Sequence, residues 1–305
     1  MDLLQIGDLS RDGLGEVLEL AKTPSGRSPL GGRGAALVFE HPSARTRNAT
    51  EMAIVQLGGH PVTIRGEEVG FDHRESVEDV ARTLACYHAA ILARVANHST
   101  LERMSAELRR SGSSVPVVNL LSDLEHPTQA LADLLTIDQC LGRVAGTSVA
   151  FIGDANNVAR SLGDALALSG ASFRVASPPG FAFDEADVAR VAEFGGELVL
   201  CATAEEAARD ADVLYTDVWI SMGEEAQASE KRAAFASFSI DAALLAVANP
   251  EAIVMHCLPA HRGEEITAEV LEGRQSRVWL QAENRMHSIR GLLEYLFVDP
   301  DNLAK

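Results

Sequence analysis

The stretch that best indicates the fold is Ala35-Ala36-Leu37-Val38-Phe39-Glu40-His41-Pro42-Ser43-Ala44-Arg45-Thr46-Arg47. Its first five residues are apolar, and its last five contain two arginines. The apolar half predicts a buried strand, and the residues that follow, to Leu57, predict a helix. Ser43 follows Pro42 and suits the N-cap of that helix. A strand that passes through a short turn into a helix is the first half of a βαβ unit, the building block of parallel sheets.

Arg45 and Arg47 fall in the first turn of the predicted helix, at the positive end of its dipole, where Asp or Glu would be stabilising. The two cations make sense there if an anion completes the site. Backbone N–H groups, the hydroxyls of Ser43 and Thr46, and the Arg side chains together describe a phosphate-binding turn. The alternative is that both arginines are surface residues paired with acidic neighbours, namely Glu40 and Glu51.

The alternation of apolar runs and helical patterns continues along the chain. Strands are predicted at 35–39, 61–64, 89–94, 115–119, 147–152, 172–176, 197–201, 212–216 and 252–256. Helices are predicted at 9–22, 44–57, 75–85, 98–110, 127–141, 157–169, 184–194 and 204–209. This spacing favours α/β architecture with parallel sheets.

We therefore expect two doubly wound parallel-sheet domains joined by long helices, with a single closed barrel as the alternative. A length of 305 residues suits two domains. The first domain is predicted at 1–140 and the second at 141–280. A C-terminal helix, 281–299, is predicted to pack back on the first domain.

Composition excludes several classes of protein. A net charge of −18 and an isoelectric point near 4.9 argue against nucleic acid or an anionic membrane as partner. No run approaches membrane-spanning length, and the N-terminus has no signal-peptide pattern. The four cysteines are widely separated, as expected for reduced thiols rather than a disulfide framework or a zinc site. The sequence predicts a cytoplasmic protein.

Polar residues stand where several predicted strands end, the place where open parallel sheets bind ligands. In the first half these are Arg94, a third cation that could meet an anion, and the group His126-Pro127-Thr128-Gln129. Pro127 suits a first helical position. His126 and Gln129 could then hydrogen-bond a carbonyl or amino group. The alternatives are a surface arginine and an ordinary polar helix start.

The second half repeats this pattern. Gly153-Asp154-Ala155-Asn156-Asn157 follows a strand but lacks G-x-G-x-x-G, so NAD is not predicted, and Asn157 could bind a carboxylate and an amine. Asp217 is a suitable partner for an ammonium group, and Ser221 to Gly223 begin a polar stretch, Glu224 to Arg232, that could form a lid. An acidic surface loop is the alternative interpretation.

Two further residues complete the candidate site. Cys257 ends an apolar run, where most cysteines are inert core residues. Arg285 lies near the start of the last predicted helix, where the helix dipole again disfavours a cation. Together these residues describe a cationic phosphate site in the first domain facing a site for a zwitterion in the second.

Four motifs resemble those of ornithine carbamoyltransferases, in that family's order and across nearly the whole chain. They are Ser43-Ala44-Arg45-Thr46-Arg47, His126-Pro127-Thr128-Gln129, Asp217-Val218-Trp219-Ile220-Ser221-Met222-Gly223 and His256-Cys257-Leu258-Pro259. The first two are similar to transcarbamylases in general, including aspartate carbamoyltransferases. The last two point to ornithine.

The resemblance implies the roles of matched residues. Carbamoyl phosphate would be bound by Ser43, Ala44, Arg45, Thr46, Arg94, His126, Gln129, Cys257, Leu258 and Arg285. Ornithine would be bound by Asn157, Asp217, Ser221 and Met222. Arg45, Arg94, His126 and Cys257 would act in catalysis, without metal or cofactor. The resemblance also implies a homotrimer or a multiple of trimers.

Two positions depart from the family pattern. Ala44 stands at the second position of the family's Ser-Thr-Arg-Thr-Arg motif, which removes one hydroxyl, and Gly70 stands where the family commonly has Gln. The implied activity is transfer of the carbamoyl group to the δ-amine of L-ornithine, giving citrulline and phosphate, most naturally in arginine biosynthesis. Alternatives are a carbamoyltransferase for putrescine or an acylated ornithine, and a non-catalytic regulatory relative.

Overall fold

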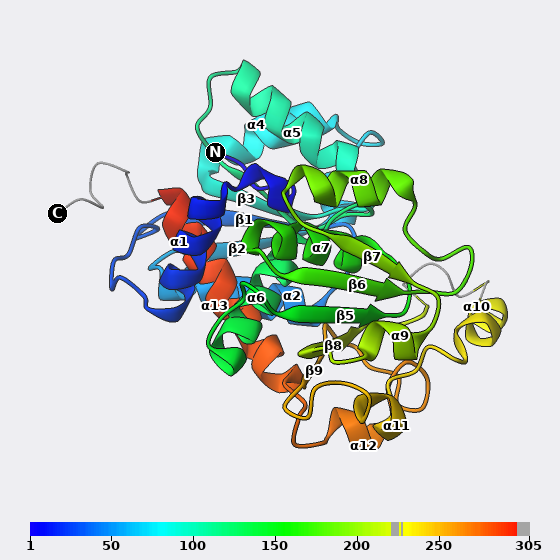
Figure 1. The fold of residues 1–305 in the computed structure, drawn as a ribbon. Helices are drawn as coiled ribbons and strands as arrows, with labels where there is room; N and C mark the ends of the chain where they lie inside the picture. Colours follow the sequence, from blue (N-terminus) through cyan, green and yellow to red (C-terminus); the bar gives the residue numbers. More distant parts are fainter. Residues whose placement is uncertain (221–225, 227, 298–305) are drawn as a thin grey trace. The chain divides into compact units, whose positions relative to one another are not determined.

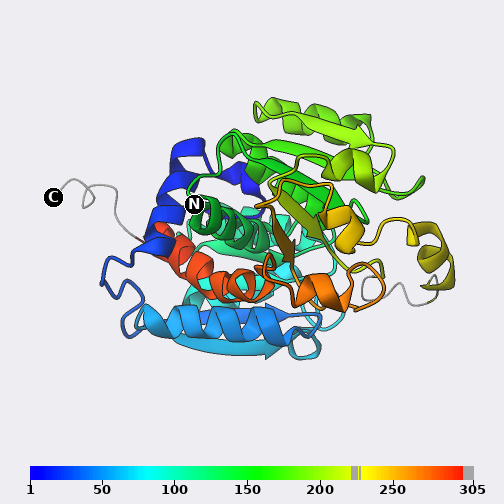
Figure 2. The same ribbon diagram turned by 60° about the horizontal axis from the view of Figure 1, so that its bottom comes forward.

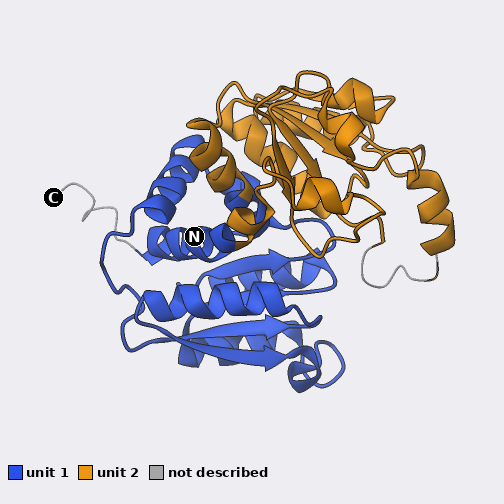
Figure 3. Ribbon diagram, turned by 90° about the horizontal axis from the view of Figure 1, so that it is seen from below, with its two compact units in different colours: residues 1–132, 283–305 blue, residues 133–282 orange. Residues whose placement is uncertain are grey.

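The computed structural model describes residues 1–220, 226 and 228–297. Two compact units are present: one holds Met1–Ala132 and the chain from Glu283 onward, and the other holds Asp133–Ala282 (Figure 3). Two long helices carry the chain from one unit to the other, α6 (Pro127–Leu141) and α13 (Val278–Phe297).

The first unit is built on a four-stranded parallel sheet with the strand order β2-β1-β3-β4 (Figure 1). Its strands are β1 (Gly34–Phe39), β2 (His60–Arg65), β3 (His88–Arg94) and β4 (Val117–Leu121). β1 and β3 are central and mostly apolar, because helices cover both faces of a parallel sheet. The helices are η1 (Ile6–Asp8), α1 (Arg11–Lys22), α2 (Ala44–Gln56), α3 (Gly66–Val69), α4 (Val77–Tyr87) and α5 (His98–Arg110).

The C-terminal helix α13 returns to the first unit and lies against α1 (Figure 2). Gly291 permits this close approach, because a Cβ there would stand only 2.6 Å from the backbone of Val17 and Ala21. The guanidinium of Arg290 adds a hydrogen bond of 2.7 Å to the Ala21 carbonyl oxygen. The predicted packing of this helix on the first domain is confirmed.

The second unit contains a five-stranded parallel sheet with the order β7-β6-β5-β8-β9. Its strands are β5 (Ser148–Ile152), β6 (Ser172–Ala176), β7 (Leu198–Cys201), β8 (Val213–Thr216) and β9 (Ile253–His256). Its helices are α7 (Asn157–Ser169), α8 (Glu185–Glu193), α9 (Ala204–Ala208), α10 (Ala228–Phe235), α11 (Ala242–Leu245) and α12 (Ala268–Leu271). One apolar core joins α9, α10, α11 and α12 to the sheet.

The predicted α/β class with two parallel sheets is confirmed, and the alternative of one closed barrel is wrong. Five short helices were not predicted from the sequence, η1, α3, α10, α11 and α12, because three to eight residues hold too few turns to show a periodicity. The position of Arg285 also needs correction. Helix α13 begins at Val278, so Arg285 lies beyond its first turn and outside the reach of the dipole.

No helix in the described part of the chain combines the length and the apolar character needed to cross a bilayer.

Candidate active site

Each sheet has one topological switch point, where successive crossovers leave in opposite directions. In the first unit it lies between β1 and β3, and in the second between β5 and β8. Ligands of open α/β sheets bind beyond the carboxyl ends of the strands at this point. In the first unit the Ser43–Arg47 motif follows β1, and Arg94 is the last residue of β3. In the second unit Asn157 follows β5, and Asp217 follows β8.

Helix α2 begins at Ala44 and is capped as predicted. The Ser43 hydroxyl accepts a hydrogen bond from the Thr46 amide at 3.4 Å, and it donates to the Thr46 hydroxyl at 3.1 Å. The first turn contains no acidic residue. Its remaining N–H groups and the positive end of the helix dipole are therefore available to an anion.

The two arginines of this turn differ in their surroundings. Arg47 lies 3.6 Å from the Glu51 carboxylate, so the alternative of a surface ion pair holds for Arg47. Arg45 is exposed and makes no hydrogen bond or ion pair with any residue that the structure describes. Glu40, its other suggested partner, instead accepts a hydrogen bond from the Ala96 amide at 2.7 Å. Arg45 is thus the cation of this turn left for a ligand.

Three more of the predicted residues, Arg94, His126 and Arg285, lie close to one another and to Thr46 of this turn. Arg285 donates a hydrogen bond of 2.6 Å to the Thr46 hydroxyl, joining α13 to α2. The positive charges of Arg285 and Arg94 both act on His126. All four side chains are buried, as is that of Gln129 in the first turn of α6. Two guanidiniums beside the first turn of α2 concentrate positive charge and N–H donors, which suit an anionic ligand.

His126 is neutral in this cluster. Burial, reinforced by the charges of Arg285 and Arg94, holds the pKa of its imidazole well below the ordinary 6.5. A neutral imidazole has one N–H donor and one acceptor. It can therefore donate to a carbonyl oxygen without adding a further charge to the site.

The low pKa of His126 predicts a pH dependence of stability. In the unfolded chain the imidazole has a pKa of about 6.5 and takes up a proton below that pH, whereas the folded protein does not. The free energy of unfolding should therefore fall with decreasing pH, by up to about 1.4 kcal/mol per pH unit from this residue. His126→Asn should flatten the curve by about 1 kcal/mol between pH 6.5 and 5.5, where the unfolded imidazole goes from half to mostly protonated. Urea unfolding followed by circular dichroism measures both slopes, and identical slopes would contradict a neutral His126.

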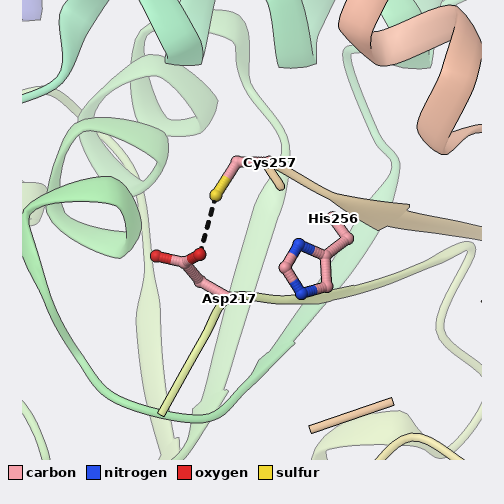
Figure 4. Close-up of side chains that lie close together, drawn as sticks. All are labelled: Asp217, His256 and Cys257. Atoms are coloured by element: carbon pink, nitrogen blue, oxygen red, sulfur yellow. Dashed lines mark hydrogen bonds between the residues drawn. The ribbon is translucent and has the colours of Figure 1, made fainter. Parts of the chain in front are cut away.

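In the second unit Asp217 is held at the end of β8 by two side chains. The thiol of Cys257, which follows β9, donates to one oxygen of the Asp217 carboxylate at 2.8 Å (Figure 4). The amide of Asn156 donates to the other oxygen at 2.9 Å. Asp217 and Cys257 are both buried. A buried carboxylate whose two oxygens are oriented by neighbouring side chains is suited to accept hydrogen bonds from a ligand ammonium group.

Asn156 was not among the site residues predicted from the sequence, whereas its neighbour Asn157 was. Asn156 is the N-cap of α7: its side-chain oxygen accepts from the Val158 amide at 2.9 Å and the Ala159 amide at 3.2 Å. Its side-chain NH₂ is thereby directed at Asp217. The preference of Asn for N-cap positions is a signal that could have identified it. Asn157 is the first residue of α7 and is partly exposed.

The segment after β9 is shaped by His256, whose side chain is fully buried. The Leu258 amide donates to Nδ1 of His256 at 2.9 Å, so the ring proton sits on Nε2 and is donated to Glu265 at 3.0 Å. Leu258 has a φ of +61°, a conformation rare for residues other than glycine. Such backbone strain concentrates at functional sites, and here the His256 ring helps to hold it.

The donor atoms of Asp217, His256 and Cys257 lie within 4.8 Å of one another, a spacing that suits a metal ion. However, both ring nitrogens of His256 already make hydrogen bonds, and the Cys257 thiol is bound to Asp217. A metal would have to break these contacts. The arrangement is that of a hydrogen-bonded cluster.

Four positions singled out from the sequence remain: Ser221 and Met222, assigned to ornithine, and Ala44 and Gly70, which depart from the family pattern. Ser221 and Met222 lie outside the described residues. Of the departures from the family pattern, Ala44 is exposed at the first position of α2. Gly70 ends α3 with a φ of +56°, where a side chain such as that of Gln would be strained. The local backbone thus accounts for Gly70.

Both halves of the chain match profiles of one protein family. Residues 1–139 match the aspartate/ornithine carbamoyltransferase carbamoyl-P binding domain, and residues 145–296 match the aspartate/ornithine carbamoyltransferase Asp/Orn binding domain. The chain belongs to the aspartate/ornithine carbamoyltransferase family.

Individual relatives point to one branch of the family. The ornithine carbamoyltransferase of Acidothermus cellulolyticus is 49% identical over 288 residues, which cover 93% of this chain and 91% of that protein. The ornithine carbamoyltransferase of Hyperthermus butylicus is 45% identical, covering 96% of each chain. Among solved structures, the ornithine carbamoyltransferase of Pyrococcus furiosus is similar with a TM-score of 0.90 and 40% identity, covering 96% of each chain.

Proposed function

We propose that this protein transfers the carbamoyl group of carbamoyl phosphate to the δ-amine of L-ornithine, giving L-citrulline and phosphate. The observation that carries the proposal is the contact of Asp217 with Cys257 at the switch point of the second sheet. The buried Asp217 carboxylate would bind the ammonium group of an amino acid. The arginines of the first unit, Arg45, Arg94 and Arg285, would bind a phosphate group. The names of the relatives favour ornithine over putrescine or an acylated ornithine as acceptor.

Carbamoyl phosphate is assigned to the first unit. Its phosphate group would accept hydrogen bonds from the N–H groups and hydroxyls of residues 43–46 and from Arg45. The buried pair Arg94 and Arg285 would add positive charge. His126, neutral and buried, would donate to the carbonyl oxygen together with Thr46 and Arg94, and Gln129 would bind the carbamoyl NH₂ group. The Arg285 contact to Thr46 supports this assignment, since it orients the hydroxyl.

Ornithine is assigned to the second unit. Asp217 would bind its α-ammonium, and Asn157 its carboxylate. Asn156 would act by holding the Asp217 carboxylate in place. Ser221 and Met222 are assigned to ornithine on the family motif alone. Cys257 and Leu258 would lie at the reacting centre.

The reaction then needs little covalent help from the protein. The δ-ammonium of ornithine, with an ordinary pKa of about 10.4, must lose a proton before its lone pair can attack the carbonyl carbon. A tetrahedral intermediate forms, the carbon–oxygen bond to phosphate breaks, and phosphate leaves with the bonding pair. Donors at the oxyanion and at the leaving phosphate would stabilise the developing charge. Orientation of the two substrates accounts for about 7–11 kcal/mol in favourable cases.

Cys257 is assigned to positioning and not to nucleophilic attack. Its thiol donates a hydrogen bond to Asp217, which keeps the proton on sulfur, whereas a nucleophilic cysteine acts as the thiolate. Carbamoyl phosphate is already activated, so a covalent cysteine intermediate is unnecessary. The thiol and the carboxylate would together orient the amine.

The same family membership supports three broader proposals. We place the enzyme in arginine biosynthesis and in the cytoplasm, and we propose that it forms a homotrimer or a multiple of trimers. The widely spaced cysteines and the acidic composition agree with a cytoplasmic protein. Analytical ultracentrifugation would test the assembly, and a monomer at micromolar concentration would contradict it.

The activity is tested by product formation from carbamoyl phosphate with ornithine, putrescine, N-acetylornithine and aspartate as parallel acceptors. We expect a preference for ornithine of more than about 100-fold in kcat/KM over putrescine, because a site built to bind polar groups rejects acceptors that lack them. Preference for another acceptor would leave the phosphate assignment standing and overturn the ornithine assignment. Absence of turnover with every acceptor would favour a regulatory relative.

A further inference from the structure

Besides the Asp217–His256–Cys257 cluster, the loop that follows Cys257 holds a second group of side chains of the types that can bind a metal ion. Donor atoms of His261, Glu264 and Glu265 all lie within 4.8 Å of one another. A tight turn brings them together: the Glu264 amide donates to the His261 carbonyl oxygen at 2.9 Å, and the Gly263 amide donates to that of Ile266 at 2.9 Å. The group is therefore held by backbone hydrogen bonds.

Two carboxylate oxygens of this group are buried without a partner. Oε2 of Glu265 and Oε2 of Glu264 have no hydrogen-bond donor among the described residues. Glu265 is completely buried, and its other oxygen is already used by His256 and by the His261 amide. Its Oε2 points toward Nδ1 of His261, 3.9 Å away. Buried carboxylate oxygens are normally hydrogen-bonded or bound to a cation, so both oxygens need an explanation.

The neighbouring cations do not provide one. Arg232 donates to Oε1 of Glu264 at 3.1 Å, and its own side chain is half exposed, so it leaves Oε2 uncompensated. The His261 ring is also half exposed and makes no hydrogen bond within the described residues. The site is thus open to solvent on the side of His261 and closed at Glu265.

We propose that His261, Glu264 and Glu265 form a binding site for one divalent transition-metal ion of the zinc type. One imidazole and two carboxylates are a usual donor set for such ions, whereas Mg²⁺ and Ca²⁺ prefer oxygen donors alone. A metal about 2.0–2.2 Å from each ligand holds ligand atoms roughly 3–4 Å apart. Here Nδ1 of His261 and Oε2 of Glu265 are 3.9 Å apart, and all three donor atoms lie within 4.8 Å of one another. Water would complete the coordination.

Hydrogen bonds connect the proposed metal site to the Cys257–Leu258 segment through Glu265 and His256. Glu265 would bind the metal through Oε2 while its Oε1 accepts the hydrogen bond from His256. His256 in turn holds the strained backbone of Leu258 beside Cys257. A bound metal would fix the Glu265 carboxylate and thereby stabilise the shape of this segment.

The experiment titrates the chelator-treated full-length protein with Zn²⁺ and with Co²⁺. Calorimetry gives the affinity and stoichiometry, and the Co²⁺ absorption spectrum shows whether sulfur is a ligand. His261→Ala and Glu264→Gln remove ligands at exposed or partly exposed positions, so neither should prevent folding. His73→Ala, an exposed histidine of the first unit, is the matched control. Cys257→Ser controls for binding at the Asp217–Cys257 cluster.

We expect one ion per chain, weakened more than about tenfold in His261→Ala and Glu264→Gln, since loss of even an outer partner of a metal site costs about 10–100-fold. His73→Ala and Cys257→Ser should bind normally, and the Co²⁺ spectrum should lack a thiolate charge-transfer band. Zn²⁺ should raise the Tm of the unaltered protein and not that of His261→Ala. Absence of binding, affinity unaffected by both ligand substitutions, or a thiolate band would each overturn the proposal.

Discussion

Arg45→Ala should reduce kcat/KM for carbamoyl phosphate by at least about 10²–10³-fold, the range seen when one donor to a developing anion is removed. Arg45 is exposed at the start of α2, and its side chain makes no hydrogen bond or ion pair with the described residues. Its positive charge, placed where the helix dipole disfavours it, has no structural role in the folded chain. The loss should therefore appear in catalysis and leave the Tm within about a degree, because exposed substitutions of this kind change stability by less than about 0.5 kcal/mol.

Arg47→Ala is the matched control, because it removes the same side chain from the same helical turn. Arg47 is engaged by Glu51 at 3.6 Å, an exposed pair worth little to stability. The kcat/KM of Arg47→Ala should stay within about threefold of the unaltered enzyme, since an exposed charge that is already paired with Glu51 acts on the site only through a screened field. Arg45→Lys should recover part of the activity by restoring charge without the two-pronged donor geometry. Near-normal turnover of Arg45→Ala would refute the phosphate-binding assignment of this turn.

Asp217→Ala should raise the KM for ornithine by about 10- to 150-fold, the equivalent of one charge-assisted hydrogen bond of about 1.5–3 kcal/mol. The KM for carbamoyl phosphate should change less, because all of its proposed ligands except Cys257 and Leu258 belong to the other unit. The substitution also removes the acceptor of the Cys257 thiol and of the Asn156 amide. A decrease in kcat is therefore expected as well, as the reacting amine loses its orientation.

Asp212→Asn separates this effect from a general loss of acidic charge. Asp212 precedes the other end of the same strand, β8, where it accepts from the Ser148 amide at 2.9 Å and from Asn249 at 3.1 Å. It should leave both KM values unchanged, whatever it costs in stability. Steady-state kinetics with each substrate varied in turn provides the comparison. An ornithine KM that is the same in Asp217→Ala and in the unaltered enzyme would place the acceptor site elsewhere.

Much of the fold follows from local features of the sequence. Apolar runs of four to seven residues gave the strands of both sheets, and α5, α6 and α7 begin and end where their helical patterns do. Ser43 and Pro127 mark helix starts as predicted, because capping and the fixed φ of proline act within one turn. Polar residues at the ends of runs could likewise be recognised as site candidates, since all strand ends of a parallel sheet face one edge.

Contacts between distant parts of the chain could not be predicted in this way. Arg285 and Thr46 are 239 residues apart, and nothing in either local pattern indicates that their side chains meet. The same is true of Asn156 with Asp217 and of Cys257 with Asp217. The two contacts of Asp217 depend on strand order, which places β8 between β5 and β9, and the contact of Arg285 depends on the return of α13 to the first unit. Strand order is decided by the packing of whole layers and leaves no periodicity in the sequence.

The charges of the ionisable side chains in the site also depend on contacts between distant parts of the chain. The order of residues fixes which ionisable groups the protein has and, for most of them, the strand or helix on which they lie. Folding in three dimensions makes His126 neutral, because burial and two neighbouring cations act on it together. Folding also buries carboxylate oxygens of Glu264 and Glu265 without a hydrogen-bond donor among the described residues. Desolvation and Coulomb energies depend on distances through space, which the order of residues along the chain does not specify.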